Sequence, residues 1–208
     1  GASTTFTIRF NAPGAGAYTG TVTIANNDSD ENPYTFTVTA TGMNPEIQVR
    51  EGTTNIADGG TYTYGNVNVG SSRQLTFTIE NGAAATSNLY LTGAPKVSIT
   101  GSADFVIASQ PASTSINPGG STTFAVRYTP SGTGADTATI SIANNDVNEN
   151  PYNFTITGTG VNPEIEVRDP SNVPLFDGTG SYSHGNQKVN TAGAALTYTI
   201  RNTGTMGD

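Results

Sequence analysis

The chain has 208 residues with 16 acidic and 8 basic side chains, so its formal net charge is −8. An acidic chain disfavours binding to nucleic-acid phosphate or anionic lipid, and no apolar run approaches the roughly 18 residues that a spanning helix needs. We therefore expect no nucleic-acid partner, no membrane contact by this segment, and no signal peptide or anchor within it. Because the sequence has no Cys, disulfides, zinc–thiolate sites and thiol nucleophiles are excluded.

Thr, Ser, Asn and Gly together account for 97 of the residues. Long helices cannot be drawn from such a composition, so it predicts an all-β protein with many turns. Charged residues make up only 12% of the chain, and two of the eight basic residues are Lys. A surface of hydroxyls and amides is more frequent in extracellular β-proteins than in cytosolic enzymes, which favours an extracellular or cell-surface location.

The first 43 residues contain three segments in which apolar and polar residues alternate. Alternation with a period of two predicts strands with one face in a core and the other in water. We therefore expect three strands here. Their shared apolar face consists of Phe6, Ile8, Val22, Ile24, Phe36 and Val38.

An acidic loop, residues 26–32, joins the second and third of these expected strands. Its carboxylate and amide oxygens are the ligands that Ca²⁺ prefers, so this loop is the first candidate metal site. The equivalent loop, residues 144–150, has one carboxylate fewer, and neither loop fits the EF-hand pattern. We favour a hairpin turn in which Asn and Asp accept hydrogen bonds from the backbone, and we expect no ordered cation at Asp28, Asp30 or Glu31.

Residues 44–160 contain about eight further alternating or short apolar segments, separated by Gly- and Asn-rich turns. Strands this short, without helical periodicity between them, predict an antiparallel sandwich of two sheets. A unit of about 117 residues buries enough surface to fold alone. The expected core side chains are Phe77, Ile79, Phe124, Val126, Ile140, Ile142, Phe154 and Ile156.

Candidate chemistry beyond the acidic loops is sparse. His184 is the single imidazole, and because Tyr64 takes its place in the other copy of the turn, we interpret it as an aromatic filler. Two N-glycosylation sequons begin at Asn27 and Asn153, and we interpret them as accidents of an Asn- and Thr-rich chain. Residues 136–138 (Asp-Thr-Ala) resemble a bacterial O-glycosylation acceptor, but the other repeat has Tyr-Thr-Gly (residues 18–20) in their place, so we give this motif little weight. No nucleophile elbow or phosphate-binding loop occurs in a strand–helix context, so we expect no catalytic, metal or cofactor-binding residues and no enzymatic activity.

An internal repeat organises the chain. Gly1–Arg50 aligns on Gly119–Arg168 without a gap at an offset of 118, with 31 of 50 positions identical. Such a period is too long for a solenoid and suits a tandem array of sandwich domains. We predict that residues 44–160 form a complete unit, that residues 1–43 are the last part of a preceding unit, and that residues 161–208 are the first part of a following one.

The units are expected to be joined by very short linkers, residues 43–45 (Met-Asn-Pro) and 161–163 (Val-Asn-Pro). Pro fixes its own φ and biases the preceding Asn towards extended conformations, and Met43 or Val161 can bury against both neighbouring units. A three-residue linker spans at most about 11 Å. Successive domains should therefore stack end to end with limited bending.

Several motifs follow one another in the complete unit: NPEI, LTFTI, LYLTG, INPGGSTTF, ENPY and GTG. In this order they resemble the repeats of bacterial choice-of-anchor D surface proteins, which are similar to the ASH (abnormal-spindle and hydin-like) immunoglobulin-like domains. The resemblance covers essentially the whole chain. It implies an immunoglobulin-like sandwich repeated many times in long secreted or cell-surface proteins, and it implies no catalytic residues.

The sequence thus predicts tandem immunoglobulin-like antiparallel β-sandwiches that serve as a stalk, adhesin shaft or extracellular filament. The expected partners are neighbouring repeats of the same protein and, in a filament, other copies. The alternative is an adhesive or carbohydrate-binding module that recognises a partner through its loops. Because the acidic loop is largely repeated between units, the shaft is favoured.

The partial units at the two ends leave a further question open. Either their missing strands belong to the same continuous chain, or the C-terminal part of one copy pairs with the N-terminal part of the next. Together the two ends lack a counterpart of residues 83–118, so we favour the continuous chain.

Overall fold

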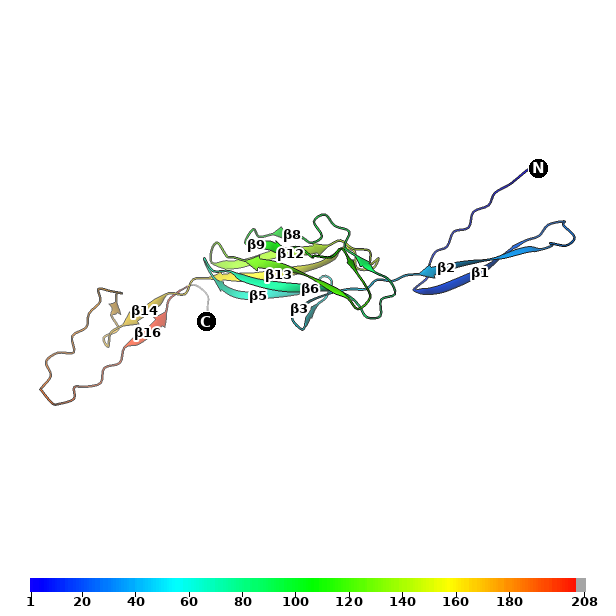
Figure 1. Cartoon of the computed structure of the whole chain (residues 1–208). Coiled ribbons are helices and arrows are strands. Elements are labelled where there is room, and N and C mark those ends of the chain that lie inside the picture. Colours follow the sequence, from blue (N-terminus) through cyan, green and yellow to red (C-terminus); the bar gives the residue numbers. More distant parts are fainter. Residues whose placement is uncertain (205–208) are drawn as a thin grey trace.

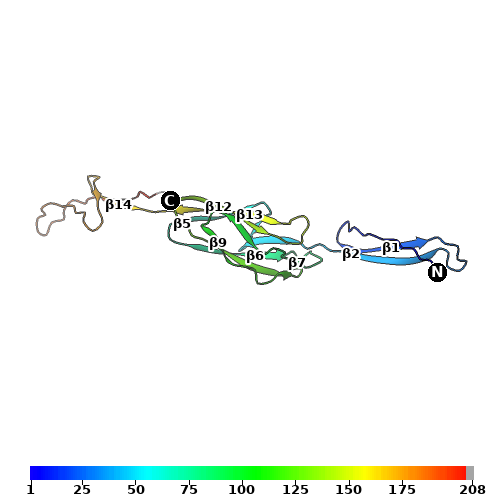
Figure 2. The ribbon, with the colours of Figure 1, turned by 90° about the horizontal axis from the view of Figure 1, so that it is seen from above.

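The computed structural model describes residues 1–204, and all its regular structure is β, as the sequence predicts. Three bodies lie in a row: a hairpin, a sandwich and a small sheet (Figure 1). The view from above shows the same order, with the sandwich in the middle (Figure 2). We call residues 1–43 the N-terminal part, residues 44–160 the central unit and residues 161–204 the C-terminal part.

The central unit is a sandwich of two sheets, with strand orders β4-β3-β6-β11-β9 and β5-β13-β12-β8. The first sheet consists of β3 (Ile47–Glu51), β4 (Thr54–Ile56), β6 (Arg73–Asn81), β9 (Phe105–Ser109) and β11 (Ser121–Tyr128). The second consists of β5 (Thr61–Asn68), β8 (Ser98–Gly101), β12 (Gly134–Ile142) and β13 (Tyr152–Val161). A third, two-stranded sheet joins β7 (Leu89–Tyr90) to β10 (Ser115–Ile116).

The core between the two sheets is the one that the alternation predicts. All eight expected core side chains are buried, each with an exposed fraction of 1% or less. Thr76, Thr123 and Thr139, which alternate with them, are exposed. A shift of one residue in any strand would reverse this arrangement, so the strand registers are confirmed.

One pairing in the sandwich is parallel rather than antiparallel. β5 runs beside β13 in the same direction, from Thr61 opposite Thr155 to Asn68 opposite Val161. The alternation of side chains has a period of two in either direction, so the sequence pattern cannot distinguish the two cases. The chain enters the first sheet as β3 and β4 and crosses to the second sheet as β5. The third strand of the unit, β5, therefore lies against β13, the strand that closes it.

The N-terminal part contains two strands instead of the three expected. β1 (Gly16–Ile24) and β2 (Tyr34–Gly42) form an antiparallel hairpin in the register of β12 and β13. The segment that carries Phe6 and Ile8 is not a strand. Its counterpart β11 is held between β6 and β9, and neither of these has a counterpart in the N-terminal part. Because a strand depends on a paired backbone, this segment stays irregular.

The C-terminal part repeats the opening of the central unit. β14 (Ile165–Arg168) pairs with β15 (Pro174–Leu175) and β16 (Thr199–Asn202), as β3 pairs with β4 and β6. Residues 181–188, the counterpart of β5, are not in a strand. β5 is held by β13, which has no counterpart in this part of the chain.

Candidate functional site

The two acidic loops are hairpin turns with the same hydrogen-bond network. In residues 144–150, the side-chain amide of Asn144 donates to two backbone carbonyls at 3.0 Å, and its Oδ1 accepts from the N–H of Asp146 at 2.7 Å. In residues 26–32, Asn26 makes the three equivalent bonds at 2.7–3.2 Å. The amide oxygens that could have bound Ca²⁺ serve instead as turn acceptors, which is the arrangement that we favoured from the sequence.

Two carboxylates of the second loop turn inward towards β3. Asp146 is fully buried; Oδ2 accepts from the N–H of Ile47 at 3.1 Å, and Oδ1 is buried without a hydrogen-bond partner. Oε2 of Glu149 is also buried and unpartnered. Burial, followed by the charges of Glu46, Asp146 and Asp58, raises the pKa of Glu149. Sequence reasoning missed this cluster, because only the packing of the loop on β3 shows that it is buried.

In the first loop, by contrast, all three acidic side chains are exposed: Asp28, Asp30 and Glu31. Over residues 1–204, no three or more His, Cys, Asp or Glu side chains are grouped so as to hold a metal ion. The same range contains no helix with the length and apolarity needed to cross a membrane. The expectation that these three acids bind no cation stays a prediction.

His184 lies in an aromatic group on the C-terminal part. Its Nε2 is 2.8 Å from the hydroxyl oxygen of Tyr198, and its ring centroid is 5.9 Å from that of Tyr182. The counterpart Tyr64 is fully buried in the central unit, where its hydroxyl donates to the carbonyl of Val126 at 2.9 Å. In the complete unit this position is therefore an aromatic core position, which supports the interpretation of His184 as a filler.

The three modification motifs lie in different settings. Asn27 is exposed in the first acidic loop, whereas Asn153 is half-buried in β13. In the Asp-Thr-Ala motif, the carboxylate of Asp136 accepts hydrogen bonds from the hydroxyls of Ser102 and Tyr128, both at 2.8 Å. The carboxylate of Asp136 thus connects β12 to the end of β11, where Tyr128 lies, and to Ser102, which follows β8.

Hydrogen bonds from backbone N–H groups hold β5 to β13 beyond both ends of the paired strands. The N–H of Gly59 donates to the carbonyl of Asn153 at 2.7 Å, and the N–H of Asn153 donates to the Asp58 carboxylate at 2.7 Å. At the other end, the N–H of Val69 donates to the carbonyl of Val161 at 2.9 Å. We call β5, β13 and these flanking bonds the terminal clamp. It ties β5, the third strand of the central unit, to its last strand.

The linker that follows the central unit is bound at both of its ends. Val161 is buried and its carbonyl belongs to the terminal clamp. The N–H of Glu164 donates to Oδ1 of Asn202 at 3.1 Å, and the N–H of Thr203 donates to the Glu164 carbonyl at 2.7 Å. Only residues 162–163 lie between these anchors.

The linker that precedes the central unit differs at its first residue. Met43 is 70% exposed, so the expectation that it buries against both neighbours is wrong. The buried counterpart Val161 is the last residue of β13, which β5 covers, whereas β2 has no such neighbour. The far end of this linker is anchored like the other, because the N–H of Glu46 donates to Oδ1 of Asn81 at 3.0 Å.

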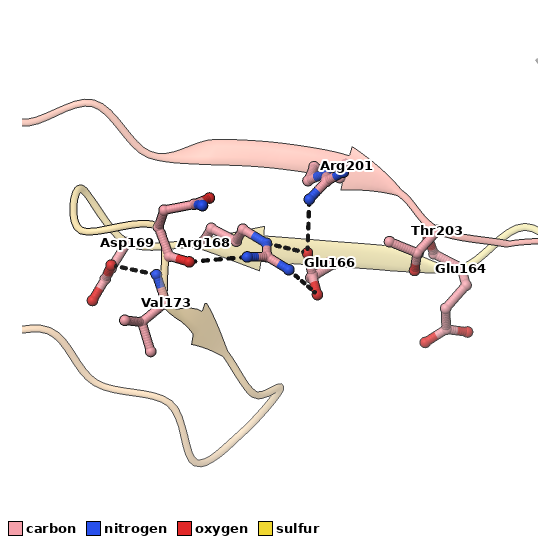
Figure 3. Close-up of polar contacts among 8 residues, drawn as sticks. Glu164, Glu166, Arg168, Asp169, Val173, Arg201 and Thr203 are labelled. Atoms are coloured by element: carbon pink, nitrogen blue, oxygen red, sulfur yellow. Dashed lines mark hydrogen bonds and ion pairs between the residues drawn. The ribbon is translucent and has the colours of Figure 1, made fainter.

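An ion-pair group on the C-terminal part shows how the repeats differ in charge. Arg168 on β14 binds the Glu166 carboxylate, with one contact at 3.2 Å, and Arg201 on β16 approaches the same carboxylate at 4.0 Å (Figure 3). In the central unit the equivalent Arg50 binds Glu80 on β6, at 2.8 Å from Nε. The carboxylate that binds this Arg therefore lies on the facing strand in the central unit (Glu80 on β6) and on the same strand as the Arg in the C-terminal part (Glu166 on β14).

This exchange involves two positions that face each other across the sheet. Gln48 lies opposite Glu80 in the central unit, and Glu166 lies opposite Arg201 in the C-terminal part. The hydrogen bond from Arg168 lowers the pKa of Glu166. After both changes the acid still lies beside the equivalent Arg: the pair across the strands, Arg50–Glu80, becomes a pair within β14, Arg168–Glu166, and Arg201 approaches from the facing strand. When the two repeats are compared by sequence alone, the change from Gln48 to Glu166 and the change from Glu80 to Arg201 look unrelated.

Two packed sheets of this topology make the central unit an immunoglobulin-like β-sandwich. Residues 57–151 match the family model described as "Abnormal spindle-like microcephaly-assoc'd, ASPM-SPD-2-Hydin" (ASH). The matched stretch supports an ASH-type immunoglobulin-like domain in the central unit and spans less than half of the chain. No curated protein matches the sequence.

Three solved structures illustrate what the chain is similar to. A protein of unknown function from Porphyromonas gingivalis W83 has 16% identity and a TM-score of 0.42, over 73% of this chain and 69% of that one. The ASH/PapD-like domain 7 of human CEP192 has 14% identity and a TM-score of 0.37, over 57% and 87% of the two chains. Domains 4 and 5 of the S-layer protein SbsC have 14% identity and a TM-score of 0.30, over 61% and 59%.

Proposed function

We propose that this chain is a non-enzymatic structural module of a long, repetitive, secreted or cell-surface bacterial protein. In this proposal, tandem immunoglobulin-like units carry tension along a stalk, adhesin shaft or extracellular filament, and their partners are neighbouring repeats. The terminal clamp is the observation that carries the proposal. The internal repeat, the Thr-, Ser- and Asn-rich composition and the short anchored linkers support the setting.

The direction of the strands in the terminal clamp suits it to tension along the chain. A pulling force enters the central unit before β3 and leaves after β13 (Figure 1). β3 and β4, which precede β5 and lie in the first sheet, bear this force first. Because β5 and β13 are parallel, the force that reaches β5 pulls these two strands past each other along their own axes. The hydrogen bonds of the pair are then loaded together, whereas a hairpin pulled open from its free ends breaks them one at a time.

Single-molecule pulling on the full chain, held at its two ends, tests this proposal. The central unit should unfold in one step and release up to about 3.6 Å for each of its residues, roughly 400 Å in all. Val69→Pro removes the N–H that donates to Val161 at one end of the clamp. We expect this variant to unfold at a lower force.

The matched control is Ile116→Ala, which truncates a buried side chain on β10, outside the clamp. Such truncations cost about 2–5 kcal/mol of equilibrium stability. At equal loss of equilibrium stability, Val69→Pro should lower the unfolding force more than Ile116→Ala does. If the force of both variants simply followed their equilibrium stability, the clamp would have no special mechanical role and the proposal would fail.

An adhesive or carbohydrate-binding module is the second candidate. It is favoured by Val147, which is 95% exposed in the second acidic loop at a position where the first loop has Ser29. Under the structural proposal, the purified chain gives no signal on a glycan microarray. A signal that disappears in Val147→Ser would identify the adhesive function instead.

A further inference from the structure

The second acidic loop, residues 144–150, packs on β3 with two of its carboxylates turned inward. We propose that Asp146 and Glu149 of this loop together bind one Ca²⁺ ion in the central unit. The site lies within the central unit and does not depend on the mechanical role proposed above. It departs from the expectation, drawn from the sequence, that the chain has no metal-binding residues.

Asp146 is the residue that points most directly to a cation. Its side chain is fully buried. Oδ2 accepts a hydrogen bond from the N–H of Ile47, but Oδ1 is buried without a hydrogen-bond partner. Burial of an ionised carboxylate is costly unless a donor or a cation lies beside each oxygen. Among the described residues, no group does this for Oδ1, so the carboxylate is suited to a positively charged ligand.

Glu149 supplies a second oxygen of the same kind. Its Oε2 is also buried without a hydrogen-bond partner. Burial is the largest cause that raises the pKa of Glu149, and the charges of Glu46 and Asp146 follow. The two carboxylates therefore lie close enough to repel each other in surroundings of low polarity. A divalent cation between them would reverse this repulsion.

The cavity beside this pair is lined by further acidic groups. It has a volume of about 300 Å³, and its lining includes Glu46, Asp58 and Glu149 together with Asn55. Of the described residues that line it, none is Lys, Arg or His. Carboxylate and amide oxygens are the ligands that Ca²⁺ prefers. Glu46 and Asp58 favour a cation even without touching it, because charges interact over several ångströms at a partly buried site.

The protein supplies only part of the coordination shell. Over residues 1–204, no three or more His, Cys, Asp or Glu side chains are grouped so as to hold a metal ion, so the inner ligands are the two unpartnered carboxylate oxygens. Ca²⁺ takes about six to eight oxygens in a flexible geometry, and water is accepted among them. The cavity has room for several water molecules. Such a site predicts a dissociation constant of about 10⁻⁴–10⁻³ M, as in extracellular calcium modules.

The first acidic loop shows that the turn alone does not make the site. Its hydrogen-bond network is the same, but Asp28 and Glu31, the counterparts of Asp146 and Glu149, are exposed. The two loops thus carry the same acidic residue types at these positions, and only the second loop buries them. The first loop therefore serves as an internal control.

Thermal unfolding of the full chain, with Ca²⁺ and with a chelator, tests the proposal. Because the ion would bind only the folded unit, about 10 mM Ca²⁺ should raise the melting temperature of the central unit by roughly 5–10 °C. NaCl at the same ionic strength should give a much smaller rise, since screening alone does not coordinate the buried oxygens. Equilibrium dialysis should find one bound Ca²⁺ per chain.

Substitution of either ligand should remove the response. Glu149→Gln and Asp146→Asn should each lose the bound ion and the rise in melting temperature. Glu149→Gln should also change the sign of its effect. In chelator it removes an uncompensated charge and should melt above the wild type, whereas in Ca²⁺ it should melt below the wild type. Asp28→Asn and Glu31→Gln make the same chemical changes in the first loop and should respond to Ca²⁺ like the unchanged chain.

Three results would overturn the proposal. One is a rise in Ca²⁺ no larger than the rise in NaCl, and another is an equal rise in the wild type and in Glu149→Gln. The third is a bound ion that Asp28→Asn removes and Asp146→Asn does not. The melting temperature of each variant in chelator shows whether the central unit still folds, which separates loss of the ion from loss of the fold.

Discussion

Asp146 and Asp28 occupy the same position in two nearly identical turns, yet Asp146 is fully buried and Asp28 is exposed. The difference comes from β3, whose first residue donates its N–H to the Asp146 carboxylate. No strand of the N-terminal part covers Asp28 in this way. Whether this Asp is buried therefore depends on the strand that packs against its loop. The packing of β3 also places Asp146 and Glu149 together in an environment of low polarity.

Glu149→Gln should raise the melting temperature of the central unit at pH 7. The pKa of Glu149 in the folded state lies above its ordinary value of 4.5, so the folded state holds the proton more tightly than the unfolded state. The wild type is therefore relatively stabilised as the pH falls from neutral towards 4.5, and the destabilising effect of the charge is present above that window. The advantage of Gln should shrink over the same range.

Scanning calorimetry of both proteins between pH 4.5 and pH 7 measures this difference. Glu31→Gln, the equivalent change in the exposed loop, is the matched control and should leave the melting temperature of the central unit unchanged at every pH. An advantage of Glu149→Gln that grew as the pH fell would contradict the assignment.

At the scale of elements, the hairpin between β12 and β13 depends on one amide. Asn144 is almost fully buried and makes three hydrogen bonds within the loop. Asn144→Ala leaves buried backbone groups unpaired, which should cost about 2–3 kcal/mol of the free energy of unfolding. Urea denaturation measures this loss. Asn148→Ala, an exposed Asn in the same loop, should stay within about 0.5 kcal/mol of wild type; equal losses in both variants would contradict a special role for Asn144.

Strands could be predicted from the sequence wherever their partners are present. The core alternation around Phe77 and Phe124 was sufficient because both sheets of the central unit are complete. The same alternation around Phe6 predicted a strand that does not form, since periodicity describes which face is apolar and not whether a paired backbone exists. The parallel direction of β5 could not be read from a pattern with a period of two.

The candidate sites divide in the same way. Local turn bonds of Asn26 and Asn144 follow from short-range sequence and could be predicted. The terminal clamp and the buried Asp146 both join residues about a hundred positions apart, so no local motif indicates them. Glu80 in the central unit is replaced by Arg201 in the C-terminal part. This change of charge can be explained only when the residue on the facing strand is known, which is Gln48 in the first case and Glu166 in the second.

At the scale of the whole molecule, the parts follow one another in a row because each linker is anchored to the unit that it enters. The N–H of Glu46 donates to Oδ1 of Asn81, and the N–H of Glu164 donates to Oδ1 of Asn202, which is the equivalent residue of the next unit. The stretch between Val161 and Glu164 is two residues long. Little backbone freedom remains there, because Pro163 fixes its own φ and restricts the residue before it.

Pro163→Gly should therefore loosen the junction between the central unit and the C-terminal part. Cysteines at the exposed residues Thr76 and Thr199 can carry spin labels, because the chain has no other thiol. Dipolar spectroscopy, with labelled chains diluted in unlabelled chain to suppress distances between copies, should give a narrow distance distribution for the wild type. Pro163→Gly should broaden this distribution, because Gly adopts a far wider range of φ and releases the preceding residue.

Pro170→Gly, in the turn between β14 and β15, makes the same chemical change outside the linker and should leave the distribution narrow. A wild-type distribution as broad as that of Pro163→Gly would show that the two residues between Val161 and Glu164 are enough to let the units swing freely. Force along the chain would then first straighten the junctions, and the terminal clamp would bear load only after that slack had been taken up.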